Sequence, residues 1–350
     1  MARIGIIGTG WGARVQAPSF REAGLEVVAI AGHRPANTRK IAAELKLEPF
    51  DDWRKLVAEP SIDLISIVTP PSEHLEMAAA VLSAGKHVLS EKPTARNAAE
   101  AQQLLDAARR APDRIVLIDH ELRFLPSFLA ARQRVRDLGE IRYIETRYSS
   151  PGRSDRTREW NWWNDADRGG GVWGAVGSHF VDTLRYLGME VEAVQATLRA
   201  TIATRPFEGG TRAVTADDFA SVNLRMRGGA LAAMTFSAVS GGPDESSVIT
   251  VHGEEGAIRL IGEELLVAMR GEPFTREAGE VMAERKGNSF GGAFGSGTFA
   301  LGQALRKAID DGDHSSLAPG ATFEDGLQQQ RVLDAARRSN ANEGRWEGVS

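Results

Sequence analysis

Short apolar runs alternate with longer amphipathic stretches over the first 120 residues of the chain. The apolar runs span residues 4–7, 26–31, 62–68, 86–90 and 114–118, and the stretches between them are rich in alanine. Runs of this length and composition predict buried strands, and the stretches between them predict helices. Strands that alternate with helices are typical of a parallel, doubly wound sheet with helices on both faces.

The hydrophobic pattern changes after residue 121. Strand-length runs then follow one another with glycine-bearing turns and few helices between them, at residues 140–149, 194–203, 218–226, 230–239, 246–253, 256–262 and 264–269. Such spacing favours antiparallel pairing. We therefore predict an α/β chain with a dinucleotide-binding Rossmann domain over residues 1–121 and an α+β domain over residues 122–350. Two final helices, near 293–310 and 321–339, can pack back on the first domain.

Composition narrows the class of protein. Hydrophobic residues make up 42% and charged residues 25% of the 350 residues, as in ordinary globular proteins. The net charge of -5 argues against a nucleic-acid partner, and the absence of cysteine excludes a disulfide framework and a thiolate metal site. No metal-type cluster and no segment typical of a signal peptide or membrane span is evident, so we expect a cytoplasmic protein away from the membrane.

The segment "RIGIIGTGWGA" contains a GxGxxA pattern directly after the first apolar run. Bare backbone at such a turn lets a pyrophosphate approach the N-terminus of the next helix. By itself the pattern fits a plain strand–turn–helix equally well. The neighbouring strands favour a cofactor site, with candidate contacts at Gly8, Thr9, Gly10, Trp11 and Gly12.

The end of the second predicted strand bears on the choice of cofactor. An acid is expected there if the cofactor has a free ribose 2′-hydroxyl, but the chain has Gly32 followed by His33 and Arg34. A guanidinium can hold a 2′-phosphate through charge-assisted hydrogen bonds. We therefore favour NADP over NAD. The alternative is that Arg34 and Arg39 only solvate the start of a helix.

The segment "AGKHVLSEKP" places Glu91 and Lys92 at the mouth of the fourth predicted strand. A lysine is costly to bury unless it is paired or used. Two interpretations remain open: Glu91 pairs with Lys92 for structural reasons, or Lys92 hydrogen-bonds a substrate hydroxyl beside a nicotinamide ring.

Read in order, the GxGxxA turn, "TPPSEH", "AGKHVLSEKP", "ELRFLPSF", "GSHFVD" and the tail "ATFEDGLQQQRVLDAARRS" resemble the glucose-fructose oxidoreductase, inositol dehydrogenase and rhizopine-catabolism (Gfo/Idh/MocA) oxidoreductase family. The resemblance implies an open-faced, mostly antiparallel second sheet, and hydride transfer between a nicotinamide and a sugar, polyol or related hydroxyl or carbonyl compound. It also implies a homodimer or homotetramer. Thr69, Pro70 and His74 would lie along the cofactor, Glu91 and Lys92 would lie beside the nicotinamide ribose, and the Lys92–Pro93 bond would be cis.

The segment "GGGVWGAVGSHFVD" carries the candidate acid–base residue, His179. At 100° per residue, an apolar stripe falls on one helix face. Ala175, His179, Asp182 and Tyr186 fall on an adjoining face. Members of the resembled family carry an aspartate four residues before this histidine, where this chain has Ala175. Asp182 could take over from the other side, or could act structurally.

Two functions fit these residues. The first is an NAD(P)-dependent dehydrogenase or reductase acting on CH–OH groups, in which Lys92 holds the substrate oxygen and His179 is the acid or base. The second is a non-catalytic sensor or regulator of the same fold, which Ala175 favours. Weaker candidates for substrate contact are Arg123, Trp163 and Asp182. For Arg123 and Trp163, a role in packing is the stronger alternative.

Overall fold

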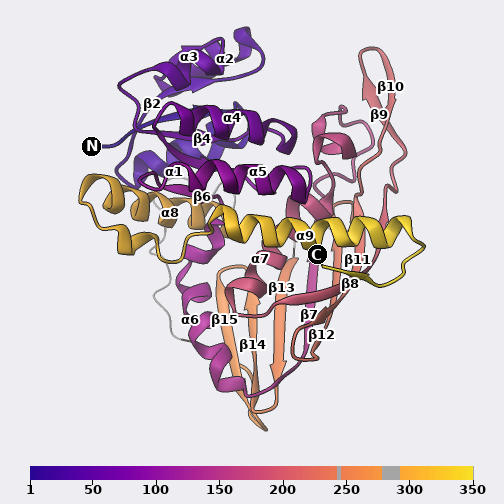
Figure 1. Cartoon of the computed structure of the whole chain (residues 1–350). Helices are drawn as coiled ribbons and strands as arrows, with labels where there is room; N and C mark the ends of the chain where they lie inside the picture. Colours follow the sequence, from indigo (N-terminus) through magenta and orange to yellow (C-terminus); the bar gives the residue numbers. More distant parts are fainter. Residues whose placement is uncertain (243–245, 278–291, 350) are drawn as a thin grey trace. The chain divides into compact units, whose positions relative to one another are not determined.

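The computed structural model describes residues 1–242, 246–277 and 292–349 (Figure 1). The chain divides into two compact units. The first contains residues 1–95 and 99–125 and the described part of 282–327. The second contains residues 96–98, the described part of 126–281, and residues 328–349. The helix at residues 292–310 therefore belongs to the first unit, although it follows most of the second unit in sequence.

The first unit is built on a six-stranded parallel sheet with the order β3-β2-β1-β4-β5-β6, within the described residues. Its strands are β1 (Arg3–Ile7), β2 (Glu26–Ala31), β3 (Glu48–Phe50), β4 (Leu64–Ile67), β5 (His87–Ser90) and β6 (Val116–Ile118). Its helices are η1 (Gly12–Gln16), α1 (Ala17–Glu22), α2 (Pro35–Leu45), α3 (Trp53–Ala58), α4 (Pro71–Ser83), α5 (Ala98–Arg109), η2 (Glu121–Phe124), α8 (Gly292–Asp310) and η7 (His314–Leu317). The five strands predicted here are confirmed, and the short β3 was not predicted.

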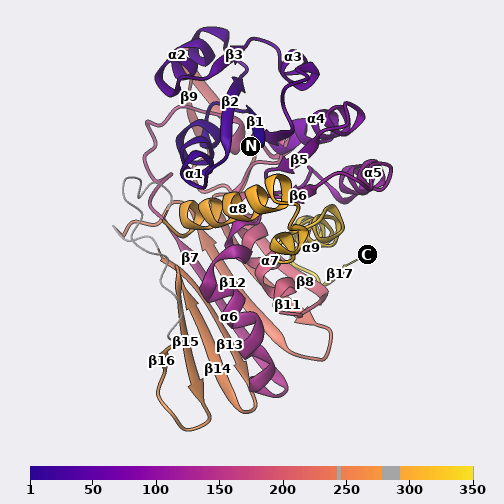
Figure 2. The same ribbon diagram turned by 90° about the vertical axis from the view of Figure 1, so that its left-hand side faces the viewer.

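Helices cover both faces of this sheet. Figure 2 shows α1 and α8 on one side of the strands and α4 and α5 on the other. Leu301 and Leu305 of α8 join Ile4, Ile6 and Phe20 in one buried cluster. The last part of the chain therefore completes a core that begins with the first strand.

The second unit is built on a nine-stranded sheet, counted over the described residues, with the order β16-β15-β14-β13-β7-β12-β11-β8-β17. Its strands are β7 (Ile141–Ser149), β8 (Val191–Arg199), β11 (Phe219–Met226), β12 (Leu231–Ser237), β13 (Ser246–Gly253), β14 (Gly256–Ile261), β15 (Glu264–Met269), β16 (Thr275–Arg276) and β17 (Glu347–Gly348); β9 (Thr204–Phe207) and β10 (Gly210–Ala213) form a separate hairpin. Neighbouring strands are antiparallel except the pair β7 and β12. The predicted mostly antiparallel sheet is confirmed, whereas the β9–β10 hairpin was not predicted.

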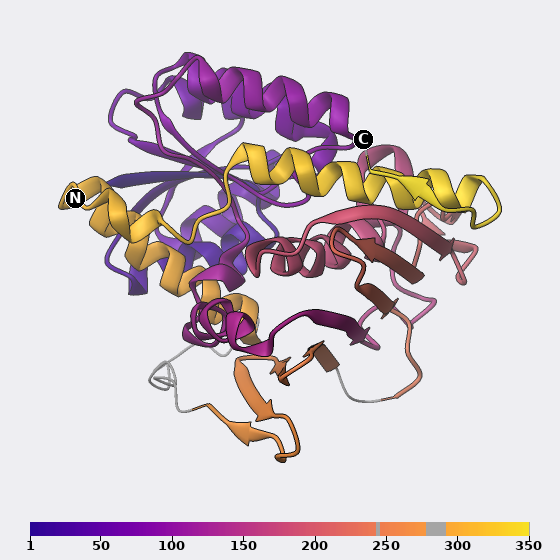
Figure 3. The ribbon, with the colours of Figure 1, turned by 60° about the horizontal axis from the view of Figure 1, so that its bottom comes forward.

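The helices of the second unit are α6 (Pro126–Arg134), η3 (Val135–Leu138), η4 (Trp162–Asn164), η5 (Ala166–Arg168), η6 (Trp173–Gly177) and α7 (Ser178–Tyr186), and it also contains most of α9 (Phe323–Ala341). Figure 3 shows α7 lying along the sheet. The ring of Phe236 on β12 packs edge-on against the rings of Trp173 and Phe180, with centroids 5.6 and 5.0 Å apart. These aromatic contacts hold η6 and α7 against the sheet.

Candidate active site

The carboxyl ends of the parallel strands gather the candidate residues of the first unit at one edge of its sheet. Gly8 follows β1, Gly32 follows β2, Thr69 lies just beyond β4, Glu91 follows β5 and Asp119 follows β6. Parallel pairing places these ends side by side, which is where open α/β sheets bind ligands.

The turn after β1 has the geometry that a dinucleotide requires. Gly8 has φ 137°, and a Cβ on it would lie 2.1 Å from the carbonyl oxygen of Val68, so only glycine fits. A Cβ on Gly10 would meet open space, which leaves the backbone there approachable. The helix that follows begins as the π-helix η1 and continues directly into α1. The turn and the helix N-terminus therefore fit a pyrophosphate. Thr9 and Trp11, the other predicted contacts in this turn, are half-buried.

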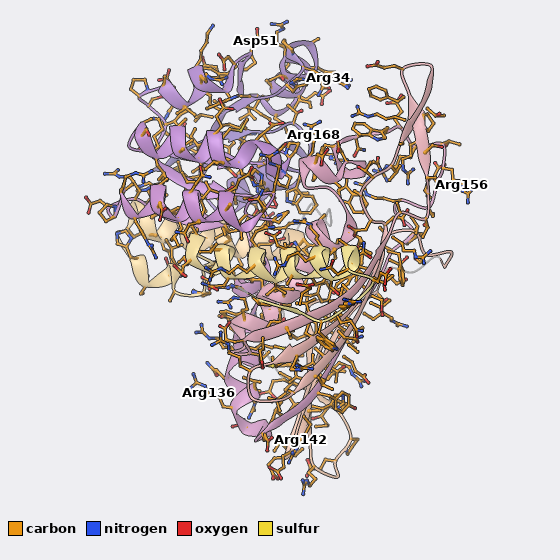
Figure 4. The ribbon with its side chains drawn as sticks, turned by 45° about the vertical axis from the view of Figure 1, so that its right-hand side comes forward. Arg34, Asp51, Arg136, Arg142, Arg156 and Arg168 are labelled. Carbon is orange, nitrogen blue, oxygen red and sulfur yellow. The ribbon has the colours of Figure 1, made fainter. Side chains whose placement is uncertain are left out.

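The end of β2 has no room for the acid that a free ribose 2′-hydroxyl usually meets. A Cβ on Gly32 would lie 2.6 Å from both Thr38 Oγ1 and Thr9 Cγ2. His33 and Arg34 follow and are exposed, and Figure 4 shows the Arg34 side chain extending from the surface of the first unit. Arg39, by contrast, is paired with Asp51 at 2.8 Å. A cation rather than a carboxylate is therefore available here.

His74 lies between two loops at this edge of the sheet. Its ring is fully buried. Nε2 lies 2.9 Å from the carbonyl oxygen of Thr69, and Nδ1 lies 3.1 Å from that of Pro93. Burial lowers the pKa of His74, against the opposing effect of these backbone contacts. His74 thus ties the loop after β4 to the loop after β5 and so positions Thr69 and Pro70, and its predicted place along a cofactor stays a prediction.

The loop after β5 carries Glu91 and Lys92, and the Lys92–Pro93 peptide bond is cis, as the family resemblance implied. Glu91 is buried and Lys92 is half-buried. Gln16 of η1 donates to Glu91 Oε1 at 3.3 Å and to Asp119 Oδ2 at 2.7 Å, while Ser66 Oγ donates to Gln16 Oε1 at 2.6 Å. One amide therefore connects the residues that follow β5 and β6.

Burial and mutual repulsion act on the carboxyl groups of this network. Burial raises the pKa of Glu91, although the Lys92 charge opposes the shift. Burial raises the pKa of Asp119 and of Glu121 well above their ordinary values, and repulsion from neighbouring carboxylates adds to it. Sequence reasoning missed Gln16, Asp119 and Glu121. The available signal for Asp119 was an acid placed directly after a buried strand.

In the second unit, Asp217 sets the start of the helix that carries His179. Its Oδ2 accepts a hydrogen bond from the Trp173 backbone N–H at 2.7 Å. Gly171 has φ 105°, and a Cβ on it would lie 2.4 Å from Asp217 Oδ1, so the glycine before the helix allows this close approach. Burial raises the pKa of Asp217 to about 6, partly offset by the Trp173 N–H.

The helix geometry around His179 corrects the prediction. Residues 173–177 form a π-helix, and the α-helix begins only at Ser178. A wheel of 100° per residue therefore does not relate Ala175 to His179, because a π-helix has more residues per turn. His179 and Asp182 are 3% and 2% exposed, so the adjoining face is as buried as the apolar stripe. Arg185 pairs with Glu190.

Two of the weaker substrate candidates have structural environments. Arg123 is 5% exposed, lies 3.4 Å from Asp325 and donates to the carbonyl oxygens of Pro319 and Gly320. Trp163 is buried, and the guanidinium of Arg153 lies 3.7 Å from its ring centroid. These contacts give Arg123 and Trp163 structural surroundings, and substrate contact by either residue stays a prediction. Within the described residues, no cluster of metal-ligand type is present and no helix is long and apolar enough to cross a bilayer.

Comparison with known proteins identifies the family. Residues 2–120 match the model of an oxidoreductase family with an NAD-binding Rossmann fold, and residues 128–259 match the GFO/IDH/MocA C-terminal domain. The chain therefore belongs to the Gfo/Idh/MocA oxidoreductase family. It is 32% identical to a glucose-fructose oxidoreductase domain-containing protein 2 of Xenopus laevis, over 99% of this chain and 93% of that protein.

Solved structures of similar fold span the whole chain. An oxidoreductase domain protein from Kribbella flavida is 25% identical, with a TM-score of 0.87 over 100% of this chain and 99% of that chain. A levoglucosan dehydrogenase in complex with NADH and levoglucosan is also 25% identical, with a TM-score of 0.85 over 99% of each chain. The fold of this protein is thus an NAD-binding oxidoreductase fold, and its relatives include sugar dehydrogenases.

Proposed function

We propose that the protein is a nicotinamide-dependent oxidoreductase that transfers a hydride between NADP(H) or NAD(H) and a sugar, polyol or related hydroxyl or carbonyl compound. The observation that carries the proposal is the sheet edge of the first unit, where the glycine turn after β1 and Lys92 after β5 lie at the ends of parallel strands. Membership of an oxidoreductase family and the likeness to levoglucosan dehydrogenase support it.

The proposed cofactor contacts are the turn Gly8–Gly12, His33, Arg34, Thr69, Pro70, Glu91 and Lys92. The crowding at Gly32 and the exposed Arg34 support a preference for NADP, because a guanidinium can pair with a 2′-phosphate. NAD is the alternative, since the similar levoglucosan dehydrogenase was solved with NADH. The ratio of kcat/KM for NADP to that for NAD decides between them.

In the proposed mechanism, a bound nicotinamide would supply the hydride acceptor for oxidation of a carbinol and the hydride donor for the reverse reaction. Lys92 donates a hydrogen bond to the substrate oxygen and stabilises the negative charge that develops on it. His179 takes the hydroxyl proton during oxidation and returns it during reduction. Asp182, one turn along the same buried face, is the proposed neighbour of the substrate in place of the family's aspartate.

The test is steady-state turnover on a panel of sugars and polyols with each cofactor, for the wild type and for Lys92→Met. We expect the variant to lose about 10²- to 10⁴-fold in kcat, with cofactor affinity changed only a few-fold. The matched control is Lys86→Met, because Lys86 is another lysine of the first unit, but it is buried and donates to the carbonyl oxygens of Glu59 and Ile62. Activity of Lys92→Met within a few-fold of the wild type rejects the role of Lys92.

A second function, a sensor or regulator that binds the cofactor without chemistry, is favoured by one residue. Ala175 has no carboxylate that could orient a catalytic histidine or stabilise its protonated form. Cofactor and sugar binding by calorimetry, without turnover on the same panel, is the outcome expected of a sensor. Turnover with any sugar or polyol excludes this alternative.

A further inference from the structure

Three guanidinium groups gather at the loop that follows β7 in the second unit. Arg205 of β9 is 2% exposed; its Nη2 donates to the carbonyl oxygen of Arg153 at 2.6 Å, and its Nη1 donates to that of Asp155 at 2.7 Å. Arg158 is exposed, and its Nη1 donates to the carbonyl oxygen of Gly152. Arg153, Arg158 and Arg205 are therefore joined at one short stretch of backbone, and we call them the arginine cluster.

Within this cluster, Arg153 is the side chain whose hydrogen-bonding capacity is not used. Its backbone N–H donates to the carbonyl oxygen of Ala238 at 2.9 Å, which fixes the loop just beyond β12. Its guanidinium lies 3.7 Å from the ring centroid of Trp163. No hydrogen bond joins this side chain to another residue of the described chain, and its Nη1 is buried without a partner. The residue as a whole is half-buried, which leaves part of the side chain open to a ligand.

The arginine cluster has no carboxylate partner among residues 1–242, 246–277 and 292–349, because no ion pair joins any of its three members to an acid there. Two carboxylates whose charges act on Arg205 are held by other groups. Asp155 accepts hydrogen bonds within its own loop, and Asp218 accepts from the N–H groups of residues 201 and 202. The cluster is thus positively charged without a paired acid.

Burial adds to the cost of this arrangement. It lowers the pKa of Arg153 to about 9, and the charges of Arg158 and Arg205 lower it further. A guanidinium with this pKa is still charged at neutral pH. A partly buried charge without a counter-ion is costly, so the contacts around Arg153 favour an anion that a ligand supplies.

The arginine cluster adjoins the helix that carries the candidate acid–base residue. β7 and β12 run parallel, with Tyr148 and Phe236 paired in register. Both of these rings pack against the ring of Phe180 in α7, with centroid distances of 6.3 and 5.0 Å. The carbonyl oxygen of Trp163 accepts from the N–H of Gly171, at 3.0 Å, in the glycine segment before η6. The end of β7 and the ring on which the cluster stacks are therefore both held against the η6–α7 helix, within the second unit.

We propose that Arg153 binds an oxyanion group of the substrate, a carboxylate or a phosphate, so that the substrates are acidic sugars or polyols. The proposal rests on the proposed function, in which His179 acts on a hydroxyl of the same molecule. A guanidinium binds an oxyanion through two parallel hydrogen bonds. Because its charge is delocalised, an anion at the open edge also offsets the charge at the buried Nη1. Arg205 is a positioning residue, since it holds the carbonyl groups of residues 153 and 155.

Two variants of the same loop make a matched pair. Arg153→Gln removes the guanidinium that stacks on Trp163 and keeps a polar side chain in its place. Arg156→Gln is the control, because Arg156 is exposed, and Figure 4 shows its side chain extending from the surface of the second unit. Both variants remove one positive charge from the loop, so a difference between them reports the site of Arg153 rather than the net charge.

The first measurement uses the protein without cofactor. The side-chain N–H signals of nitrogen-labelled arginine are followed by NMR during titration with sodium acetate or with sodium phosphate, at an ionic strength held constant with chloride. We expect the signal that is missing from Arg153→Gln, and present in Arg156→Gln, to shift and to saturate in the millimolar range. A larger shift with acetate identifies a carboxylate ligand, and a larger shift with phosphate identifies a phosphate ligand. A signal that shifts with neither anion overturns the proposal.

The second measurement compares glucose with glucuronate and with glucose 6-phosphate. By calorimetry, the wild type should bind the preferred charged sugar about 10- to 100-fold more tightly than glucose, as expected of charge-assisted hydrogen bonds. Arg153→Gln should reduce this ratio to about twofold or less, and Arg156→Gln should keep it. The ratios of kcat/KM should change in the same way, through KM. A purely structural role for Arg153 would weaken the binding of all three sugars alike, and a wild-type ratio near one rejects the proposal.

The outcomes separate this proposal from the proposed function. If charged and neutral sugars are turned over with equal kcat/KM and Arg153→Gln has no selective effect, the oxyanion site is wrong and the oxidoreductase stands. If the Arg153 signal responds to anions but no sugar, polyol or sugar acid is turned over, the oxidoreductase proposal fails and the oxyanion site stands. Where none of the three sugars binds, the acetate and phosphate titrations decide. If Arg153→Gln does not fold, Arg153→Lys replaces it for the assignment of the signal, because lysine keeps the positive charge.

Discussion

The sheet edge of the first unit and the η6–α7 helix of the second unit hold their candidate side chains by different forces. At the sheet edge, Gln16 connects Glu91 and Asp119 through hydrogen bonds of 3.3 and 2.7 Å. Around His179, the aromatic rings of Trp173 and Phe180 pack against Phe236. A polar network depends on the protonation of its members, whereas aromatic packing does not.

This difference indicates how each region should respond to change. The sheet edge should respond to pH through the shared charges of its acids, while the helix should respond mainly to loss of volume in the core. Asp217 is the exception in the second unit, because it holds the start of η6 and its pKa is raised to about 6 by burial. The following predictions test this comparison.

Replacement of His179 by Gln should have the largest effect. If His179 is the acid or base, kcat should fall about 10²- to 10⁴-fold, with little change in the midpoint of urea unfolding. His252→Gln is the control, because that histidine stacks on Tyr143 with ring centroids 4.2 Å apart, on strands β13 and β7 of the sheet. A variant with kcat within a few-fold of the wild type would show that His179 is only a packed residue.

Phe236→Ala tests the packing of the second region. Removal of the ring should lower the free energy of unfolding by about 3–5 kcal/mol, since Phe236 contacts both Trp173 and Phe180. Leu231 lies on the same strand and is 54% exposed, so Leu231→Ala should change that energy by about 0.5 kcal/mol or less. Urea denaturation measures both; equal effects would contradict the role given to the Phe236 contacts.

Asp217→Asn tests the titrating group of the second region. The pKa of Asp217 is about 6 in the folded protein, against the ordinary aspartate value of 3.8 that applies to the unfolded chain. The folded state therefore binds the proton more tightly. Wild-type stability therefore falls as pH rises from about 4 to about 6, by about 2–3 kcal/mol, and stays lower above that range.

Asp217→Asn has no carboxyl group at this position and so does not titrate there between about pH 4 and pH 7. Its unfolding free energy relative to the wild type should thus rise by about 2–3 kcal/mol between pH 4 and pH 7. Groups common to both proteins cancel in the difference. A constant difference over that range would show that Asp217 titrates normally.

Arg34→Gln should have the smallest effect. If Arg34 pairs with a 2′-phosphate, KM for NADP should rise about tenfold while KM for NAD changes less than about twofold. The control is Arg39→Gln, because Arg39 is already paired with Asp51. Equal changes for the two cofactors would assign Arg34 to helix solvation instead.

Much of the fold could be predicted from local pattern. The runs that became β1, β2, β4, β5 and β6 are continuous and apolar because both faces of a parallel sheet are buried. The strands of the second sheet were also recognisable. The β9–β10 hairpin was not, because exposed residues of β10 have no apolar face to produce a pattern.

The candidate site was predictable only in part. Gly8 and Lys92 stand in recognisable motifs, but Gln16 and Asp119 are separated by 103 positions and belong to no motif. The π-helix at 173–177 was also hidden, since its backbone geometry depends on Asp217 and on packing against β12. Similarly, nothing local to Arg123 predicts its contact with Asp325.

The sequence by itself determined the alternation of strands and helices, the glycine turn and the family, because each depends on residues that are near in the chain or on a shared motif. Only the tertiary structure decided which polar side chains are buried together. His74 connects two loops and Asp119 accepts a hydrogen bond from Gln16 because distant strands end at the same edge of one sheet. Charge and burial at that edge depend on all the neighbours at once, which no local pattern records.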